Sequence, residues 1–89
     1  MVTEWRRVLA TGKDDDGDIT SLCNSVKTWS PRSRALAISD IEGGVIGYFV
    51  QDSLKNQAIV RVKSRNSIKY LATDPDSSTA NNLDNLPDC

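Results

Sequence analysis

One stretch of this chain, residues 29–50, constrains the fold more than any other, because a helix start, a helix stop and a strand follow one another in it. Ser30 is suited to cap a helix and Pro31 to stand in its first turn, while a glycine pair further on is typical of a helix C-terminus. The glycines lead directly into an apolar and aromatic run, residues 45–50, which predicts a buried strand. We therefore expect a helix over residues 30–42 followed by a core strand.

The segments on either side of this stretch predict further strands. Before it, residues 4–10 and 19–23 read as extended, and Asp16–Gly17 between them is a strong signal for a tight hairpin. After it, residues 45–73 form three runs separated by short polar breaks. Because strands joined by short loops usually pair antiparallel, we expect an α+β fold with one helix on a mostly antiparallel sheet of four to five strands. The expected order is two strands, the helix and three strands.

The predicted core lies between the helix and this sheet. Successive helical residues advance by about 100°, so Ala37, Ile38 and Ile41 share one face. A chain of 89 residues builds a core of only marginal stability, so each apolar cluster should be needed for folding. The strand residues expected to pack against the helix are Phe49, Val60, Val62 and Leu71.

Charge divides the second half of the chain into a basic part and an acidic part. Residues 53–73 contain five basic residues and no acid, whereas residues 74–89 contain four aspartates and no base. We expect residues 1–73 to form a compact α+β domain and residues 74–89 to form an acidic, asparagine-rich tail docked on it. Leu83 and Leu86 are three residues apart, the spacing that one helical turn needs to place both on the core.

Composition argues against several classes of protein. The net charge of −1 is unlike that of most proteins that bind the phosphate backbone, so nucleic-acid binding should be weak and salt-dependent at most. No apolar run resembles a signal peptide or a membrane span, and we expect a cytoplasmic protein with no membrane association. Two cysteines without any histidine make a zinc site unfavourable. We expect no metal and no cofactor.

An acidic run, residues 14–18, invites a calcium interpretation because four of its five residues are aspartate. Placing Gly17 at the sixth position of an EF-hand loop puts Gly12 at the first position and Cys23 at the twelfth, where metal ligands belong. The template therefore fails, and we interpret the run as a solvated hairpin tip.

Basic and aromatic residues supply the candidate binding groups. Arginine and lysine side chains can meet phosphates or acidic groups, and a tryptophan or tyrosine ring can stack on a base or under a guanidinium group. Trp29, before the helix, is expected to be mainly structural, packing over the first turn or stacking under Arg32 or Arg34. The candidate binding residues are Trp29, Arg32, Arg61, Lys63, Arg65, Lys69, Tyr70, Asn82 and Asp84.

The two cysteines, Cys23 and Cys89, connect the predicted tail to the predicted domain. A docked tail would bring them together, and a disulfide closing so long a loop would stabilise the fold by roughly 4 kcal/mol in the chain-entropy model. The cytoplasm opposes such a bond, so we expect proximity of two thiols without an obligatory disulfide. The alternative is that the two cysteines are not close, with Cys23 in the core and Cys89 in a frayed C-terminus.

Short motifs stand at residues 17–24, 29–33, 40–45, 70–76 and 82–89, and they are spread over most of the length of the chain. In these motifs the chain resembles a family of small, mainly bacterial proteins classed as a domain of unknown function. The ending, YLATDPD followed by NLDNLPDC, is the most specific part, although Ala72 stands where family members carry arginine. The resemblance implies the fold and an ordered tail, and it implies no mechanism.

Two functional hypotheses follow from these observations. The first is a small, non-catalytic binding module for a protein partner, for example a phage or mobile-element accessory protein acting on a host protein. The second is a binder of a small phosphate-bearing ligand such as a nucleotide. An enzyme is not expected, because the sequence has no histidine and no acid and base at a diagnostic spacing.

Overall fold

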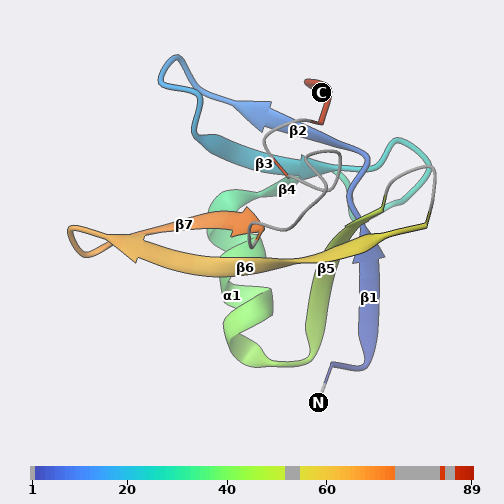
Figure 1. Cartoon of the computed structure of the whole chain (residues 1–89). Helices are drawn as coiled ribbons and strands as arrows, with labels where there is room; N and C mark the ends of the chain where they lie inside the picture. Colours follow the sequence, from blue (N-terminus) through green and yellow to red (C-terminus); the bar gives the residue numbers. More distant parts are fainter. Residues whose placement is uncertain (1, 52–54, 74–82, 84–85) are drawn as a thin grey trace.

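The computed structural model describes residues 2–51, 55–73, 83 and 86–89, and it has an α+β fold, as predicted. A four-stranded sheet has the order β1-β5-β6-β7, and a three-stranded sheet has the order β2-β3-β4 (Figure 1). Most strand pairs are antiparallel, which also agrees with the prediction. The elements are β1 (Glu4–Arg7), β2 (Ala10–Lys13), β3 (Ile19–Cys23), β4 (Arg32–Ser33), α1 (Arg34–Gly43), β5 (Ile46–Gln51), β6 (Gln57–Arg65) and β7 (Ile68–Thr73).

The prediction of a single sheet with two strands before the helix is wrong. The segment predicted as one strand, residues 4–10, belongs to two sheets, because its backbone changes partner in the middle. The amide of Val8 donates to the carbonyl of Phe49 at 2.8 Å, while the amide of Leu9 donates to the carbonyl of Cys23 at 2.9 Å. Strand β1 therefore pairs parallel with β5, and β2 starts a separate sheet with β3 and the two-residue strand β4.

Helix α1 begins later than predicted. Its N-cap is Ser33, whose hydroxyl oxygen accepts a hydrogen bond from the amide of Leu36 at 3.3 Å. The hydroxyl of Ser30 accepts instead from the amide of Asn24 at 2.8 Å, so Ser30 holds the preceding loop and caps nothing. The predicted glycine stop is confirmed, since Gly44 adopts φ 77° and its amide donates to the carbonyl of Ile41 at 3.1 Å. Among the described residues, no helix has the length and apolar character needed to cross a membrane.

The core differs from the predicted one at one aromatic position. Of the three helix residues, Ala37 is fully buried and Ile38 and Ile41 are half-buried against the core. Tyr48 and Val50 are fully buried, whereas Phe49 is half-buried on the other face, because successive residues of a strand alternate between faces. Of the other predicted core residues, Val60 and Leu71 are buried and Val62 is half-buried. The remaining large buried side chains are Val8, Ile19, Leu22 and Leu83.

The described residues of the tail lie against the rest of the chain. Leu83 is fully buried, and its amide donates to the hydroxyl of Thr73 at 3.1 Å. Thr11 in β2 then bonds both ways to the last residues: its amide donates to the carbonyl of Pro87 at 2.9 Å, and its carbonyl accepts from the amide of Cys89 at 3.0 Å. The C-terminus accordingly lies beside β2 in Figure 1. The division into a domain of residues 1–73 and a tail stays a prediction.

Candidate binding surface

The four-stranded sheet turns one face toward α1 and the other away from it. Helix α1 packs against β5, β6 and β7, and in Figure 1 strands β6 and β7 pass in front of the helix. Buried residues of these strands, such as Tyr48 and Val60, point toward the helix, so their neighbours in sequence point the opposite way. We name the side turned away from α1 the outer face. None of the described helices covers it.

Three large apolar side chains, which we name the apolar strip, lie on the outer face: Trp5, Phe49 and Ile59. Trp5 is 50% exposed and Ile59 is 45% exposed. The rings of Trp5 and Phe49 meet edge to face with centroids 6.4 Å apart, and Phe49 lies opposite Ile59 in the pairing of β5 with β6. The strip therefore runs without a break across three strands.

A glycine makes room for the tryptophan of the strip. Gly47 lies opposite Trp5 in the pairing of β1 with β5, and a Cβ atom at Gly47 would come within 2.5 Å of the indole ring. A side chain at this position would force the indole ring to move. The ring consequently lies over the backbone of β5, which fixes its position on the sheet.

Basic side chains, which we name the basic rim, occupy the outer face beside the apolar strip. Arg7 lies opposite Phe49 in the β1–β5 pairing, and its guanidinium group donates to the carbonyl of Gln51 at 3.3 Å. The basic residues of β6 alternate with the inward-facing Val60 and Val62 and therefore also point outward. The members of the basic rim are Arg7, Arg61, Lys63 and Arg65.

The structure brings together four of the candidate residues and separates the others. Tyr70 lies opposite Lys63 on the outer face, and the guanidinium carbon of Arg65 is 5.6 Å from the centre of the Tyr70 ring. Lys69 points to the helix side, where its ammonium group pairs with Glu42 at 2.6 Å. With Arg65 and Tyr70, the residues Arg61 and Lys63 make up the four candidates that lie on the outer face. Asn82 and Asp84 lie outside the described residues.

The last two candidates, Trp29 and Arg32, belong to a polar network around Asp40. The Asp40 carboxylate accepts two hydrogen bonds from Arg32, at 2.9 Å from Nε and 2.8 Å from the terminal nitrogen, and one from the Tyr48 hydroxyl at 2.5 Å. The Trp29 ring packs edge to face on Tyr48 with centroids 5.6 Å apart. These contacts join β4, the second turn of α1 and β5, so both candidates have a structural role.

Arg6 also belongs to this network, and it lies opposite Tyr48 in β1, the strand that pairs with β5. Its guanidinium group donates to the Tyr48 hydroxyl at 3.0 Å, and its carbon lies 5.5 Å from the centre of the Trp29 ring. Arg6 also pairs with Glu4 at the protein surface. Arg6 is 42 positions from Tyr48, and Asp40 lies eight positions from both Arg32 and Tyr48. The spacing of eight follows neither the helix nor the strand repeat once the chain turns between these residues, so the local sequence pattern does not indicate the network.

The network fixes the protonation states of its members. Burial alone would raise the pKa of Asp40, but the hydrogen bonds from Arg32 and Tyr48 outweigh it, so the pKa lies below its ordinary value. Burial raises the pKa of Tyr48, and its hydrogen bond to the Asp40 carboxylate raises the pKa further. Near neutral pH the carboxyl group is ionised and the phenol is neutral. The arrangement keeps the negative charge of Asp40 beside the positive charges of Arg32 and Arg6.

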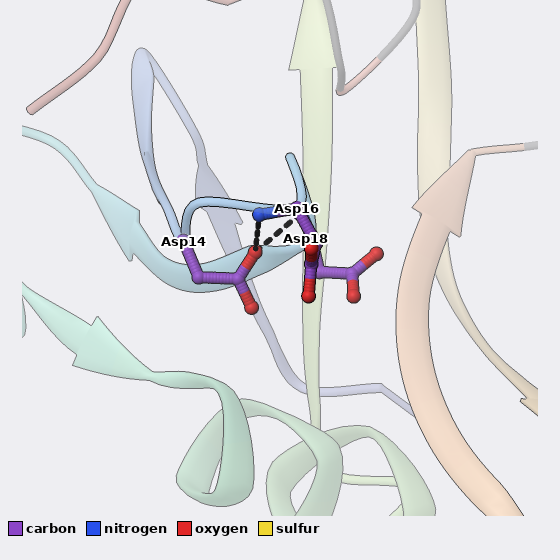
Figure 2. A group of neighbouring side chains, drawn as sticks. All are labelled: Asp14, Asp16 and Asp18. Carbon is purple, nitrogen blue, oxygen red and sulfur yellow. Dashed lines mark hydrogen bonds between the residues drawn. The ribbon is translucent and has the colours of Figure 1, made fainter.

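The acidic hairpin tip closes on itself through Asp14. Its Oδ1 atom accepts from the amides of Asp16 and Asp18, each at 3.0 Å (Figure 2). The three carboxylate groups bring ligand atoms within 4.8 Å of one another, and all three residues are exposed. The bonds to Asp14 explain the local turn geometry, which is a structural role.

Two hollows lie beside the three-stranded sheet. The first, of about 320 Å³, lies between the β2–β3 and β6–β7 hairpins, and it is lined by residues that include Asp18, Arg65 and Tyr70. The second, of about 450 Å³, is lined mainly by small and apolar residues, and both cysteines are among them.

The two cysteines are joined by a disulfide. Cys23 and Cys89 were predicted to be close without an obligatory bond, and their Cα atoms are 6.4 Å apart in the bonded pair.

The fold and the outer face define a small α+β protein with an exposed sheet surface. A comparison with known protein families identifies the family to which it belongs. Residues 7–87 match a family described as "Protein of unknown function (DUF3892)". The chain belongs to this family. No curated protein and no solved structure matches it.

Proposed function

We propose that the protein is a non-catalytic binding module that docks a protein partner on the outer face of its four-stranded sheet. The apolar strip carries this proposal, because two of its three side chains are about half exposed although they are large and apolar. A contiguous apolar patch on a monomer is often a binding site, since leaving it in water is unfavourable.

Two properties of the strip favour a protein as the partner. Tryptophan and arginine are enriched among the residues that contribute most to protein interfaces. The Trp5 ring already packs over Gly47 and against Phe49, so less side-chain entropy would be lost when a partner covers it than for a ring without these contacts. Arg7 borders the strip, and the matching partner surface would carry an apolar centre and an acidic group facing Arg7.

A phosphate-bearing ligand remains the second hypothesis and has weaker support. The first hollow is within the size range of small-molecule sites, and the stacked pair of Arg65 and Tyr70 would suit a nucleotide. Asp18 lines the same hollow, however, and two more aspartates of the hairpin tip are close to it. Their negative charge would repel a phosphate.

The non-catalytic part of the proposal is supported by the state of the buried polar groups. The Asp40 carboxylate is already engaged by Arg32 and Tyr48, and the lowered pKa of Asp40 makes it a poor acid or base near neutral pH. The described polar network is therefore better suited to stability than to catalysis.

Site-directed photocrosslinking in the source organism tests the docking surface. A benzoylphenylalanine residue replaces Ile59 in the apolar strip, and in control proteins it replaces Val26, which is 79% exposed in the loop before β4, or Leu36, which is 50% exposed on the helix. We expect a protein adduct from position 59 that neither control forms. In the position-59 protein, Arg7→Glu should reduce the adduct several-fold by reversing the charge beside the strip.

Two results would contradict this proposal. The same adducts from positions 26, 36 and 59 would show non-specific contact. Micromolar or tighter binding of a single-stranded oligonucleotide at physiological salt, lost in the Arg7→Glu protein, would show that the outer face binds nucleic acid.

A further inference from the structure

The Cys23–Cys89 disulfide is unequally exposed at its two ends. Cys23 ends the middle strand of the three-stranded sheet and is 7% exposed. Cys89 is exposed and follows two other exposed residues, Pro87 and Asp88. Of the two cysteine residues, Cys89 is therefore the more accessible to a thiolate that approaches from solvent.

The surroundings of the disulfide suit exchange with another protein. The bond borders the second hollow, of about 450 Å³, whose wall includes Leu9 and Pro31 and offers an apolar surface for docking. The hydroxyl of Ser21 lies 3.9 Å from the sulfur of Cys23 and 4.0 Å from that of Cys89. It can donate a weak hydrogen bond to the Cys23 sulfur when that sulfur leaves as a thiolate.

The segment that carries Cys89 has few other attachments. Two backbone hydrogen bonds join it to Thr11, and Lys13 bonds the Leu86 carbonyl and the Asp88 carboxylate, each at 3.2 Å. The preceding anchor is the fully buried Leu83. Among the described residues, the contacts that would still hold residues 87–89 without the disulfide are two backbone hydrogen bonds to the buried Thr11 and the exposed Lys13–Asp88 ion pair.

We propose that Cys23–Cys89 is a reversible disulfide that a dithiol protein reduces by attack on Cys89, and that its reduction releases residues 87–89 from β2. The attacking thiolate forms a bond to the Cys89 sulfur, and the bond between the two cysteines breaks with its electron pair on Cys23, which takes up a proton. The second thiol of the dithiol protein then attacks the mixed disulfide and leaves Cys89 as a thiol. Two electrons and two protons pass to this chain, and the dithiol protein becomes a disulfide.

The first experiment locates the attacked sulfur. The oxidised full-length protein is mixed with a thioredoxin variant that lacks its resolving cysteine, and the trapped mixed disulfide is mapped by peptide mass spectrometry. We expect at least tenfold more adduct on Cys89 than on Cys23. Predominant attack on Cys23, or no adduct under native conditions while denatured protein reacts, would overturn the proposal.

The second experiment tests the release by amide hydrogen exchange in the oxidised protein and in protein reduced with dithiothreitol. We expect the Thr11 and Cys89 amides to exchange at least tenfold faster after reduction, while the amide of the core residue Val50 changes little. Unchanged exchange at Thr11 would show that the segment stays bound. Equal acceleration at Val50 would show unfolding of the whole domain, and either result would overturn local release.

Discussion

Replacing Asp40 with asparagine tests whether the buried polar network stabilises the fold. Asp40 accepts three hydrogen bonds, two of them from a charged guanidinium group, and its side chain is 10% exposed. Hydrogen bonds to charged groups contribute about 1.5–3 kcal/mol each, but they are not additive within one network. Removing one partner of a buried ion pair costs about 3–5 kcal/mol. Because the Arg32 side chain is 28% exposed and water can reach it, we expect the lower end, about 3 kcal/mol.

The effect of this substitution should depend on pH in a defined direction. The folded protein lowers the pKa of Asp40, so the ionised carboxyl group stabilises the fold above its ordinary pKa of about 3.9. That stabilisation is lost as the pH falls through the lowered pKa of the folded state. The difference in unfolding free energy between the wild type and Asp40→Asn should therefore be full at pH 7 and shrink below about pH 4.

Urea unfolding followed by tryptophan fluorescence and circular dichroism measures this difference at pH 7 and at pH 3. The matched control is Asp88→Asn, which removes an ion pair with Lys13 from a side chain that is 81% exposed. We expect the control to cost at most about 1 kcal/mol, because exposed ion pairs contribute little. An equal loss in both variants, or a loss below about 0.5 kcal/mol in Asp40→Asn, would refute the role of the network.

Two further substitutions test the tail and the apolar strip. Leu83→Ala should lower the free energy of unfolding by about 2–5 kcal/mol, since a fully buried leucine is truncated, and an unchanged urea midpoint would show that the tail adds nothing to the core. Gly47→Ala should cost about 1–3 kcal/mol and change the Trp5 fluorescence, because the new methyl group collides with the indole ring. A control variant, Gly43→Ala, adds a methyl group where nothing lies within 4 Å and should cost less than Gly47→Ala.

The parts of the fold that depend on neighbouring residues could be predicted from the sequence. The helix ends at the glycines because Gly44 takes a left-handed conformation that other residues resist, and Gly17, with φ 83°, follows the same rule. A hairpin forms around Gly17 as predicted, but residues 14–18 make up its loop and the expected two-residue turn is absent. The helix start was misplaced because Ser30 and Ser33 are equally suitable caps by type. Ser33 is the cap because β3 pairs with Arg32 and Ser33, which keeps both residues extended and lets the helix begin only after them.

Contacts between distant residues could not be predicted in the same way. The parallel pairing of β1 with β5 joins segments separated by 42 positions, such as Glu4 and Ile46, and no local pattern signals it. The apolar strip was missed for this reason, because Trp5 gains its importance only when it lies beside Phe49. The outward direction of the basic residues of β6 could be predicted, because apolar and basic residues alternate along this one segment of the sequence. The hydrogen bonds of Asp40 join it to residues eight positions away on either side, and they form only when β4, α1 and β5 have packed together.

The long-range pairing of both ends of the chain has a consequence for synthesis on the ribosome. Strands β1 and β2 are made early, but β1 gains its partner only with β5, and β2 is complete only when residues 87–89 lie beside it. Folding can therefore finish only after residue 89 has emerged from the exit tunnel. Until β5 has also emerged, Val8 lacks its native cover, and the nascent chain should be a substrate for chaperones that bind exposed apolar segments.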